Sequence, residues 1–255
     1  MRALYREQTY IHGDYATVSL YPVYTPIRRR HGRSKPTSDV QQRLNDFNAR
    51  ERLGRQIDAN FKPGDGFWTL TFRPEALPGT REDMIRVYQA YKRRMARYFK
   101  REGLGEMKTA AVIHGDAGTN AKRLHIHIVV DADIPAGDME KLWGNGFVSV
   151  RPLVFGPLGA RGIAEYMMAG MEWGRVMTTR NIIDPEPTER TGRISAAAVQ
   201  ELHDNWDNKQ AYQGRWPGYE IADVRPFYNT FNRQYYLRVY LYKPRRDRKN
   251  GAQTV

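Results

Sequence analysis

Two kinds of hydrophobic pattern alternate through the middle of the chain. β-Branched and aromatic residues dominate four short segments, which predict strands at 67–72, 108–116, 123–131 and 147–154. Apolar residues at helical spacing predict helices at 80–102, 136–143 and 160–174. The order strand, helix, strand, strand, helix, strand, helix predicts an α+β fold. We expect an antiparallel sheet of the ferredoxin-like or RRM-like type, with helices packed on one face.

The first and longest of these helices has a clear beginning and a clear core face. Thr80 precedes it, and Asp83 follows three residues later in the arrangement of a capping box. Large apolar residues then recur every three or four positions, so we expect them to face the core: Met84, Tyr88, Tyr91, Met95 and Phe99.

Weaker patterns flank this core on both sides. Residues 1–62 form a basic extension with a strand at 15–24 and a polar helix at 40–56, and its charged, turn-rich stretch is expected to be flexible. Residues 181–255 are expected to add a helix at 195–213, a strand at 233–244 and a basic tail. The predicted organisation is therefore 1–62, 63–180 and 181–255.

Composition narrows the class of partner. The 255 residues include no cysteine, which excludes disulfides, thiolate metal sites and a cysteine nucleophile. A formal net charge of +13 and an aromatic content of 12% favour single-stranded nucleic acid, which binds to cations and stacking surfaces. A generic basic protein is the alternative. No apolar run is long enough to cross a bilayer and no signal peptide is evident, so we expect no membrane partner and a location in the host cytoplasm.

The segment RLHIHIVVD places two histidines on one predicted strand. Because side chains alternate along a strand, His125 and His127 share one face, and the opposite face is wholly apolar and should pack on a helix. The histidine face is then expected to open to a cleft or to solvent. His114 lies near the end of the preceding strand, so the three imidazoles can occupy one side of a metal ion. Asp116 is the competing third ligand, and two ordinary surface histidines are the simpler interpretation.

A metal-assisted attack on a phosphodiester also needs a nucleophile. Tyr166 lies in the helix after the last strand of the sheet, and a tyrosine that attacks phosphorus forms a phosphotyrosine and releases a 3′-hydroxyl. The residues alone leave open that Tyr166 is one core tyrosine among the 16 in the chain.

Together, these motifs resemble the HUH endonucleases, and among them the replication initiators (Rep proteins) of rolling-circle phages and plasmids. His125-Ile126-His127 matches the family's His–hydrophobic–His motif, and FWTLTF at 67–72 matches its Thr-rich first strand. His114 stands where phage members often carry a third, usually acidic, ligand. WGNGFVSV at 143–150 resembles the segment before the family's tyrosine helix, and GIAEYMMAG around Tyr166 resembles that helix. The resemblance covers residues 67–174.

This resemblance implies an HUH palm fold and an enzyme of defined chemistry. The expected activity is a metal-dependent, site-specific nickase and ligase of single-stranded DNA, which starts rolling-circle replication through a 5′-phosphotyrosine on Tyr166. His114, His125 and His127 would hold Mn²⁺ or Mg²⁺, and three imidazoles favour a softer ion such as Mn²⁺ or Zn²⁺. The family helix usually reads Tyr-x-x-Lys, whereas this chain has Ala169 at that position. Arg161 and Arg175 are the nearby candidates to replace the lysine.

The expected partners follow from the same reasoning. Single-stranded DNA at a replication origin would be the substrate, and a separate helicase and a host polymerase would assist, since the chain has no Walker-type segment. Cationic side chains are expected to hold the DNA: Arg93, Arg94, Arg97, Lys122, Arg123 and Arg161. Two alternatives stay open. One is a single-strand transposase of the same superfamily, and the other is a non-catalytic nucleic-acid-binding module on the same sheet.

Overall fold

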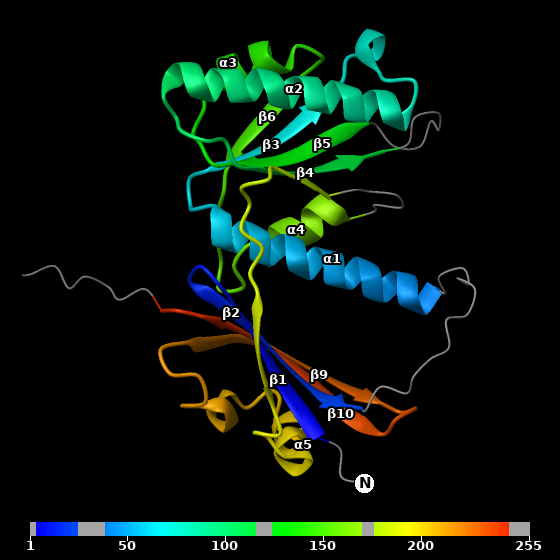
Figure 1. Cartoon of the computed structure of the whole chain (residues 1–255), viewed down its shortest axis with the longest axis vertical. Helices are drawn as coiled ribbons and strands as arrows, with labels where there is room; N and C mark the ends of the chain where they lie inside the picture. Colours follow the sequence, from blue (N-terminus) through cyan, green and yellow to red (C-terminus); the bar gives the residue numbers. More distant parts are fainter. Residues whose placement is uncertain (1–3, 25–38, 116–123, 170–175, 245–255) are drawn as a thin grey trace, which may run out of the picture. The chain divides into compact units, whose positions relative to one another are not determined.

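The computed structural model describes residues 4–24, 39–115, 124–169 and 176–244. The chain divides into two compact units, one made of Met1–Arg33 with Glu186–Val255, and the other of Ser34–Pro185. The elements of the second unit (Figure 1) are α1 (Asp39–Asn60), β3 (Gly66–Thr71), η1 (Pro74–Ala76), α2 (Arg81–Glu102), β4 (Thr109–His114), β5 (His125–Val130), α3 (Ala136–Trp143), β6 (Val148–Pro152), α4 (Arg161–Met168) and β7 (Val176–Thr178).

The sheet of the Ser34–Pro185 unit has the strand order β6-β3-β5-β4-β7, and every neighbouring pair is antiparallel. β5 therefore separates β3 from β4, which run parallel to each other and are connected through α2. In the same way, β3 separates β5 from β6, which are connected through α3. Two such split β-α-β units make a ferredoxin-like sheet, which confirms the predicted α+β class.

Helices cover both faces of this sheet, whereas the sequence led us to expect them on one (Figure 1). On one face, α2 and α3 pack over Ile126, Ile128 and the other apolar residues of β5. On the other face, α1 and α4 pack over a cluster that includes Ala110, Val112 and Val129. The expectation failed because α1 was interpreted as a polar helix of an extension. Its second half carries a buried apolar stripe of Leu53, Ile57 and Phe61.

The longest core helix begins and packs as its sequence predicts. The Thr80 hydroxyl accepts a hydrogen bond from the Asp83 backbone N–H at 3.1 Å and so caps α2. The stripe from Met84 to Phe99 is buried against the sheet. Gly103 ends the helix in the left-handed conformation, with φ of 68°.

The other unit is a second five-stranded antiparallel sheet, in the order β8-β1-β2-β10-β9. Its elements are β1 (Leu4–His12), β2 (Tyr15–Val23), β8 (Pro187–Thr191), α5 (Ala196–Asp204), η2 (Lys209–Tyr212), β9 (Glu220–Asn229) and β10 (Gln234–Tyr242). β2 and β10 match the predicted strands, and Ser195 caps α5, although α5 ends well before residue 213. A buried cluster that includes Val18, Val199 and Val239 joins α5 to the sheet.

The compact units follow boundaries other than the predicted 62/63 and 180/181. α1 belongs to the same unit as the central sheet, while the N-terminal strands pair with strands from the C-terminal region. The expected flexible stretch after residue 25 and the basic tail lie outside the described residues. None of the helices in the described ranges has both the length and the apolar character that a membrane crossing requires.

Candidate metal and nucleophile site

The register of the β4–β5 hairpin brings three histidines together. His114 pairs directly with His125, and directly paired residues of an antiparallel sheet point to the same face. His127 follows two residues later on that face. The ring centroids lie 4.8 Å apart for His114 and His125, 5.0 Å for His114 and His127, and 4.8 Å for His125 and His127. One nitrogen from each ring lies within 4.8 Å of the others, so the triad could hold a metal ion.

Two of the imidazoles are oriented by contacts with neighbouring elements. Thr69 of β3 pairs with His127, and its Oγ1 lies 3.0 Å from His127 Nδ1. His114 Nε2 donates a hydrogen bond to the backbone carbonyl of Met167 in α4. A metal ion bound by these two rings would therefore use His127 Nε2 and His114 Nδ1. Such outer contacts are what fixes ring orientation at metal sites.

The histidine face is less open than expected. His114 and His127 are buried, and His125 is half-buried. The sheet face is divided along its strands, because one half is apolar and packs against α1 and α4, while the polar half carries the triad together with Thr69 and Thr71. Burial lowers the pKa of His127 to about 3, and repulsion from His125 and His114 adds to the effect. His127 is therefore neutral at physiological pH, the form that binds metals.

Tyr166 lies beside the triad on α4. Its ring centroid is 4.9 Å from that of His127 and 6.0 Å from that of Phe67, which itself stacks on His127. Unlike the histidines, Tyr166 has 57% of its surface exposed. The structure thus brings together an accessible phenol and a possible metal site, as the motif order predicts.

The position of Tyr166 depends on how α4 begins. Ala160 precedes the helix and has no side chain that could cap it. Asp58 of α1 supplies the cap instead, because its Oδ1 accepts a hydrogen bond from the Ala160 N–H at 2.6 Å. Gly159 has φ of 60°, and a Cβ there would meet the same carboxylate at 2.5 Å. This close approach explains the glycine.

Two other tyrosines considered from sequence lie elsewhere. Tyr88 and Tyr91 are fully buried between α2 and the sheet, on the face opposite the histidines. Burial raises the pKa of Tyr88 to about 12 and raises the pKa of Tyr91 as well. Neither phenol can reach a phosphate at the triad, so both are core residues.

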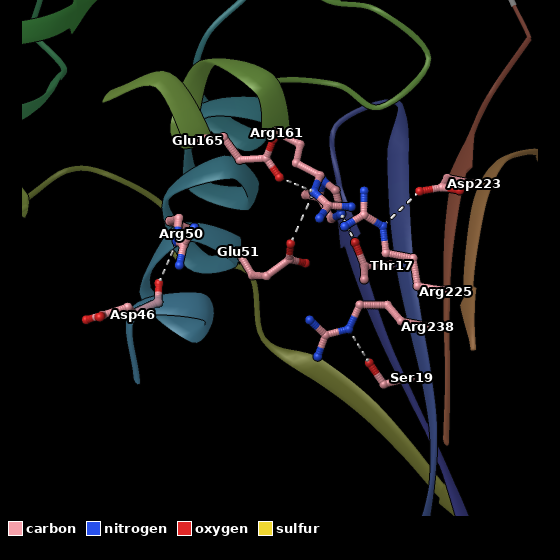
Figure 2. Close-up of polar contacts among 11 residues, drawn as sticks. Thr17, Ser19, Asp46, Arg50, Glu51, Arg161, Glu165, Asp223, Arg225 and Arg238 are labelled. Carbon is pink, nitrogen blue, oxygen red and sulfur yellow. Dashed lines mark hydrogen bonds and ion pairs between the residues drawn. The ribbon is translucent and has the colours of Figure 1, made fainter. Parts of the chain in front are cut away.

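Arg161 is placed as a structural residue and not as a DNA ligand. Figure 2 shows it between Glu51 of α1 and Glu165 of its own helix. Its Nε lies 3.4 Å from Glu51 Oε1 and 3.1 Å from Glu165 Oε1. Arg161 and Glu51 are both buried, so this guanidinium neutralises carboxylates between two helices and does not replace the missing lysine.

The remaining predicted DNA contacts divide into three groups. Arg94 donates to the backbone carbonyls of Leu142 and Trp143, and so caps the C-terminal end of α3. Arg93 and Arg97 are exposed on α2, across the sheet from the triad. The others lie outside the described residues: Lys122, Arg123, Asp116 and Arg175.

The helix that carries Tyr166 is shorter than the sequence predicted. α4 ends at Met168, and Ala169 has an extended backbone, with φ of −65° and ψ of 127°. Gly170 follows in the sequence at a position where glycine commonly ends helices. The residue three after Tyr166 is therefore at the helix end and exposed.

These features share one segment with a known family. Residues 65–172 match the family model described as Replication-associated protein ORF2/gene 2 protein. The matched segment includes the triad and Tyr166, and it agrees with the resemblance to rolling-circle initiators found in the motifs. Searches of the curated proteins and of the solved structures found no match to this chain.

Sequence reasoning missed Thr69 and Phe67 in this replication-associated segment. Both precede the triad by many residues, and only the β3–β5 register places them against His127. The alternation in FWTLTF held a signal, because Thr69 and Thr71 occupy the face opposite Trp68 and Leu70.

Proposed function

We propose that this replication-associated protein is a metal-dependent nickase and ligase of single-stranded DNA, with Tyr166 as its nucleophile. The proposal rests on one observation above all, the 4.9 Å separation between the exposed Tyr166 ring and the buried His127 ring. A phosphodiester bound at the triad would lie within reach of the phenol.

The reaction would be a transesterification at phosphorus. Tyr166 Oη forms a bond to phosphorus and loses its proton, while the bond from phosphorus to the 3′ oxygen breaks and that oxygen gains a proton. The products are a 5′-phosphotyrosine and a free 3′-hydroxyl. Attack by a 3′-hydroxyl on the phosphotyrosine reverses the step and joins ends, with no net consumption of water.

The chain's own residues would prepare this step. Three imidazoles would hold the divalent ion, which polarises a non-bridging phosphate oxygen when it is bound. Mn²⁺ fits this donor set better than Mg²⁺, because imidazole suits softer ions. Thr69 and the Met167 carbonyl would orient two of the rings, and Phe67 would hold the plane of the His127 ring by stacking on it.

The biological role that fits this chemistry is the start of rolling-circle replication. The 3′-hydroxyl would prime synthesis by a host polymerase, and a separate helicase would open the duplex at the origin. The replication-associated family match supports DNA as the partner.

A second function is favoured by Ala169. Without a basic residue at this position, the same sheet could bind nucleic acid and leave it uncut. The two functions differ in whether a covalent adduct forms.

A covalent-adduct gel separates them. The full chain is incubated with Mn²⁺ and a labelled pool of random-sequence single-stranded DNA, then denatured and resolved. We expect a shifted band that is absent with EDTA, with Tyr166→Phe and with His127→Ala. Tyr228→Phe, an exposed tyrosine of the other unit, is the matched control and should retain the band.

The other outcomes have defined meanings. A band that survives Tyr166→Phe would assign the nucleophile to another residue. DNA binding without any adduct, for the pool and for a selected tight-binding sequence, would favour the non-catalytic module.

A further inference from the structure

Phe231 stands at the tip of the β9–β10 hairpin with 97% of its surface exposed. This hairpin is the orange and red pair of strands in Figure 1. Phe227 and Tyr228, near the end of β9, are exposed as well. A concentration of exposed aromatic rings on one structural element marks a surface that a partner covers.

Side-chain hydrogen bonds fix the loop that carries Phe231. Asn229 Oδ1 accepts from the backbone N–H groups of Phe231 at 3.0 Å and Asn232 at 3.4 Å. The Asn232 amide donates to the Tyr236 hydroxyl at 2.8 Å, and its Oδ1 accepts from the Gln234 N–H at 3.1 Å. The exposure of Phe231 is therefore built into the loop and is not a result of fraying.

Aromatic pairs stiffen the hairpin behind the tip. Phe227 pairs across the strands with Tyr236, and their ring centroids lie 5.8 Å apart. Tyr228 pairs with Tyr235 on the other side of the ribbon, at 4.9 Å. Cross-strand aromatic pairs stabilise two-stranded ribbons, so the tip is a rigid projection with an apolar end.

The charge of this segment suits a polyanion. Residues 224–236 contain two arginines and no acidic residue, and one of these, Arg233, is an exposed residue of the tip itself. Arg233 adopts φ of 53°, in the left-handed region that is unfavourable for a side chain of its size. The loop thus accepts a strained backbone at the residue that places a cation two positions from Phe231.

We propose that the hairpin tip, residues 227–236, is a wedge that stacks on the bases at a junction between duplex and single-stranded DNA. A single protruding ring fits the end of a base stack, as apolar wedges do when they enter DNA. Platforms for continuous single strands are instead grooves that carry a row of rings. The proposal relies on the proposed function only for the identity of DNA as the ligand.

The test measures binding in EDTA, so that DNA cleavage cannot contribute. Three DNAs are compared with the full chain: a hairpin stem with a single-stranded arm, a single strand of equal length and a blunt duplex. 2-Aminopurine at the first base pair of the stem reports stacking. The variants are Phe231→Ser, Phe231→Trp and, as a matched control for an exposed aromatic residue of the same unit, Trp206→Ser.

We expect the wild type to prefer the junction DNA and to change its 2-aminopurine signal. Phe231→Ser should lower junction affinity about tenfold, as loss of one aromatic–base stack does, and leave the single strand unaffected. Phe231→Trp and Trp206→Ser should bind as the wild type does. Phe231 packs against almost nothing, so Phe231→Ser should keep the thermal unfolding midpoint.

Other results would overturn the proposal. Equal binding of all three DNAs by the wild type, or wild-type binding by Phe231→Ser, would do so. Phe231-dependent self-association in sedimentation, with unchanged DNA binding, would assign the tip to a protein contact. Loss of the covalent adduct with intact junction binding would reject the nuclease and retain the wedge.

Discussion

Two imidazoles of the triad have one ring nitrogen already engaged by the protein. A backbone carbonyl can only accept, so His114 Nε2 carries the proton that it donates to Met167, and Nδ1 keeps its lone pair. The Thr69 hydroxyl can donate or accept. Coordination through His127 Nε2 requires that Nδ1 carry the proton and donate to Thr69 Oγ1. The hydroxyl therefore selects the tautomer that binds a metal.

Replacing Thr69 tests this selection. Thr69→Val keeps the shape and β-branching but removes the hydroxyl, and we expect Mn²⁺ affinity to fall by about 10- to 100-fold, the usual effect of losing such a partner. Thr69→Ser should retain most of the affinity. Calorimetric titration with Mn²⁺ measures both, and wild-type affinity in Thr69→Val would contradict the assigned role.

The lowered pKa of His127 predicts how stability depends on pH. An unfolded histidine titrates near 6.5, whereas His127 in the folded chain has a pKa of about 3. Above pH 6.5 both states are neutral and contribute no pH dependence. Between pH 6.5 and 3 only the unfolded state binds the proton, so the free energy of unfolding falls as the pH is lowered.

Urea unfolding of the metal-free protein at pH 7 and at pH 5 measures this loss. We expect the wild type to lose more stability than His127→Gln over that interval, because glutamine does not titrate. Equal losses in the two proteins would show that His127 is protonated in the folded state.

At the scale of elements, α4 is a short helix whose position is set by α1. Eight residues make a helix that is marginal alone, so its contacts decide its stability. α1 supplies the Asp58 cap, the Glu51 partner of Arg161 and the apolar floor of Leu53 and Ile57. Tyr166 is held near His127 because α1 holds the helix that carries it.

Removing the cap should weaken this arrangement. Asp58→Ala is expected to lower the free energy of unfolding by about 1 kcal/mol, the usual value of an N-cap, and to slow adduct formation as Tyr166 becomes less well positioned. Asp58→Asn should behave much like the wild type, since asparagine caps equally well. Urea unfolding and the adduct gel test this, and a fully stable Asp58→Ala would place the helix under the control of other contacts.

At the scale of the whole molecule, cationic charge and the candidate site lie on different surfaces of the central unit. α2 carries Arg93 and Arg97 on its exposed side, and the sheet separates this helix from the triad. These arginines can hold phosphates of DNA that extends beyond the site but cannot take part in the reaction. Charge should therefore affect binding and leave the chemical step unchanged.

The double variant Arg93→Gln/Arg97→Gln tests this separation. We expect the slope of log affinity against log salt concentration to become shallower by about 2, roughly one for each phosphate contact removed. The adduct yield at saturating DNA should stay as in the wild type. An unchanged slope, measured by fluorescence anisotropy at several salt concentrations, would remove α2 from the DNA-binding surface.

The sequence by itself determined the features that depend on local periodicity. Period-two alternation placed His125 and His127 on one face, and helical spacing identified the buried stripe of α2. Both patterns repeat over a few residues, so no partner is needed to interpret them. The order of elements was enough for the ferredoxin-like sheet, because few topologies satisfy it.

Only the tertiary structure decided which residues meet across long separations. The β4–β5 register selected His114 as the third histidine, and the β3–β5 register brought Thr69 to His127. Contacts between α1 and α4 turned Arg161 from an expected DNA ligand into a buried ion-pair partner. The strands at 4–12 and 15–23 joined the C-terminal strands in one sheet. Strand register and helix docking depend on how distant surfaces fit, and a local pattern carries no record of that fit.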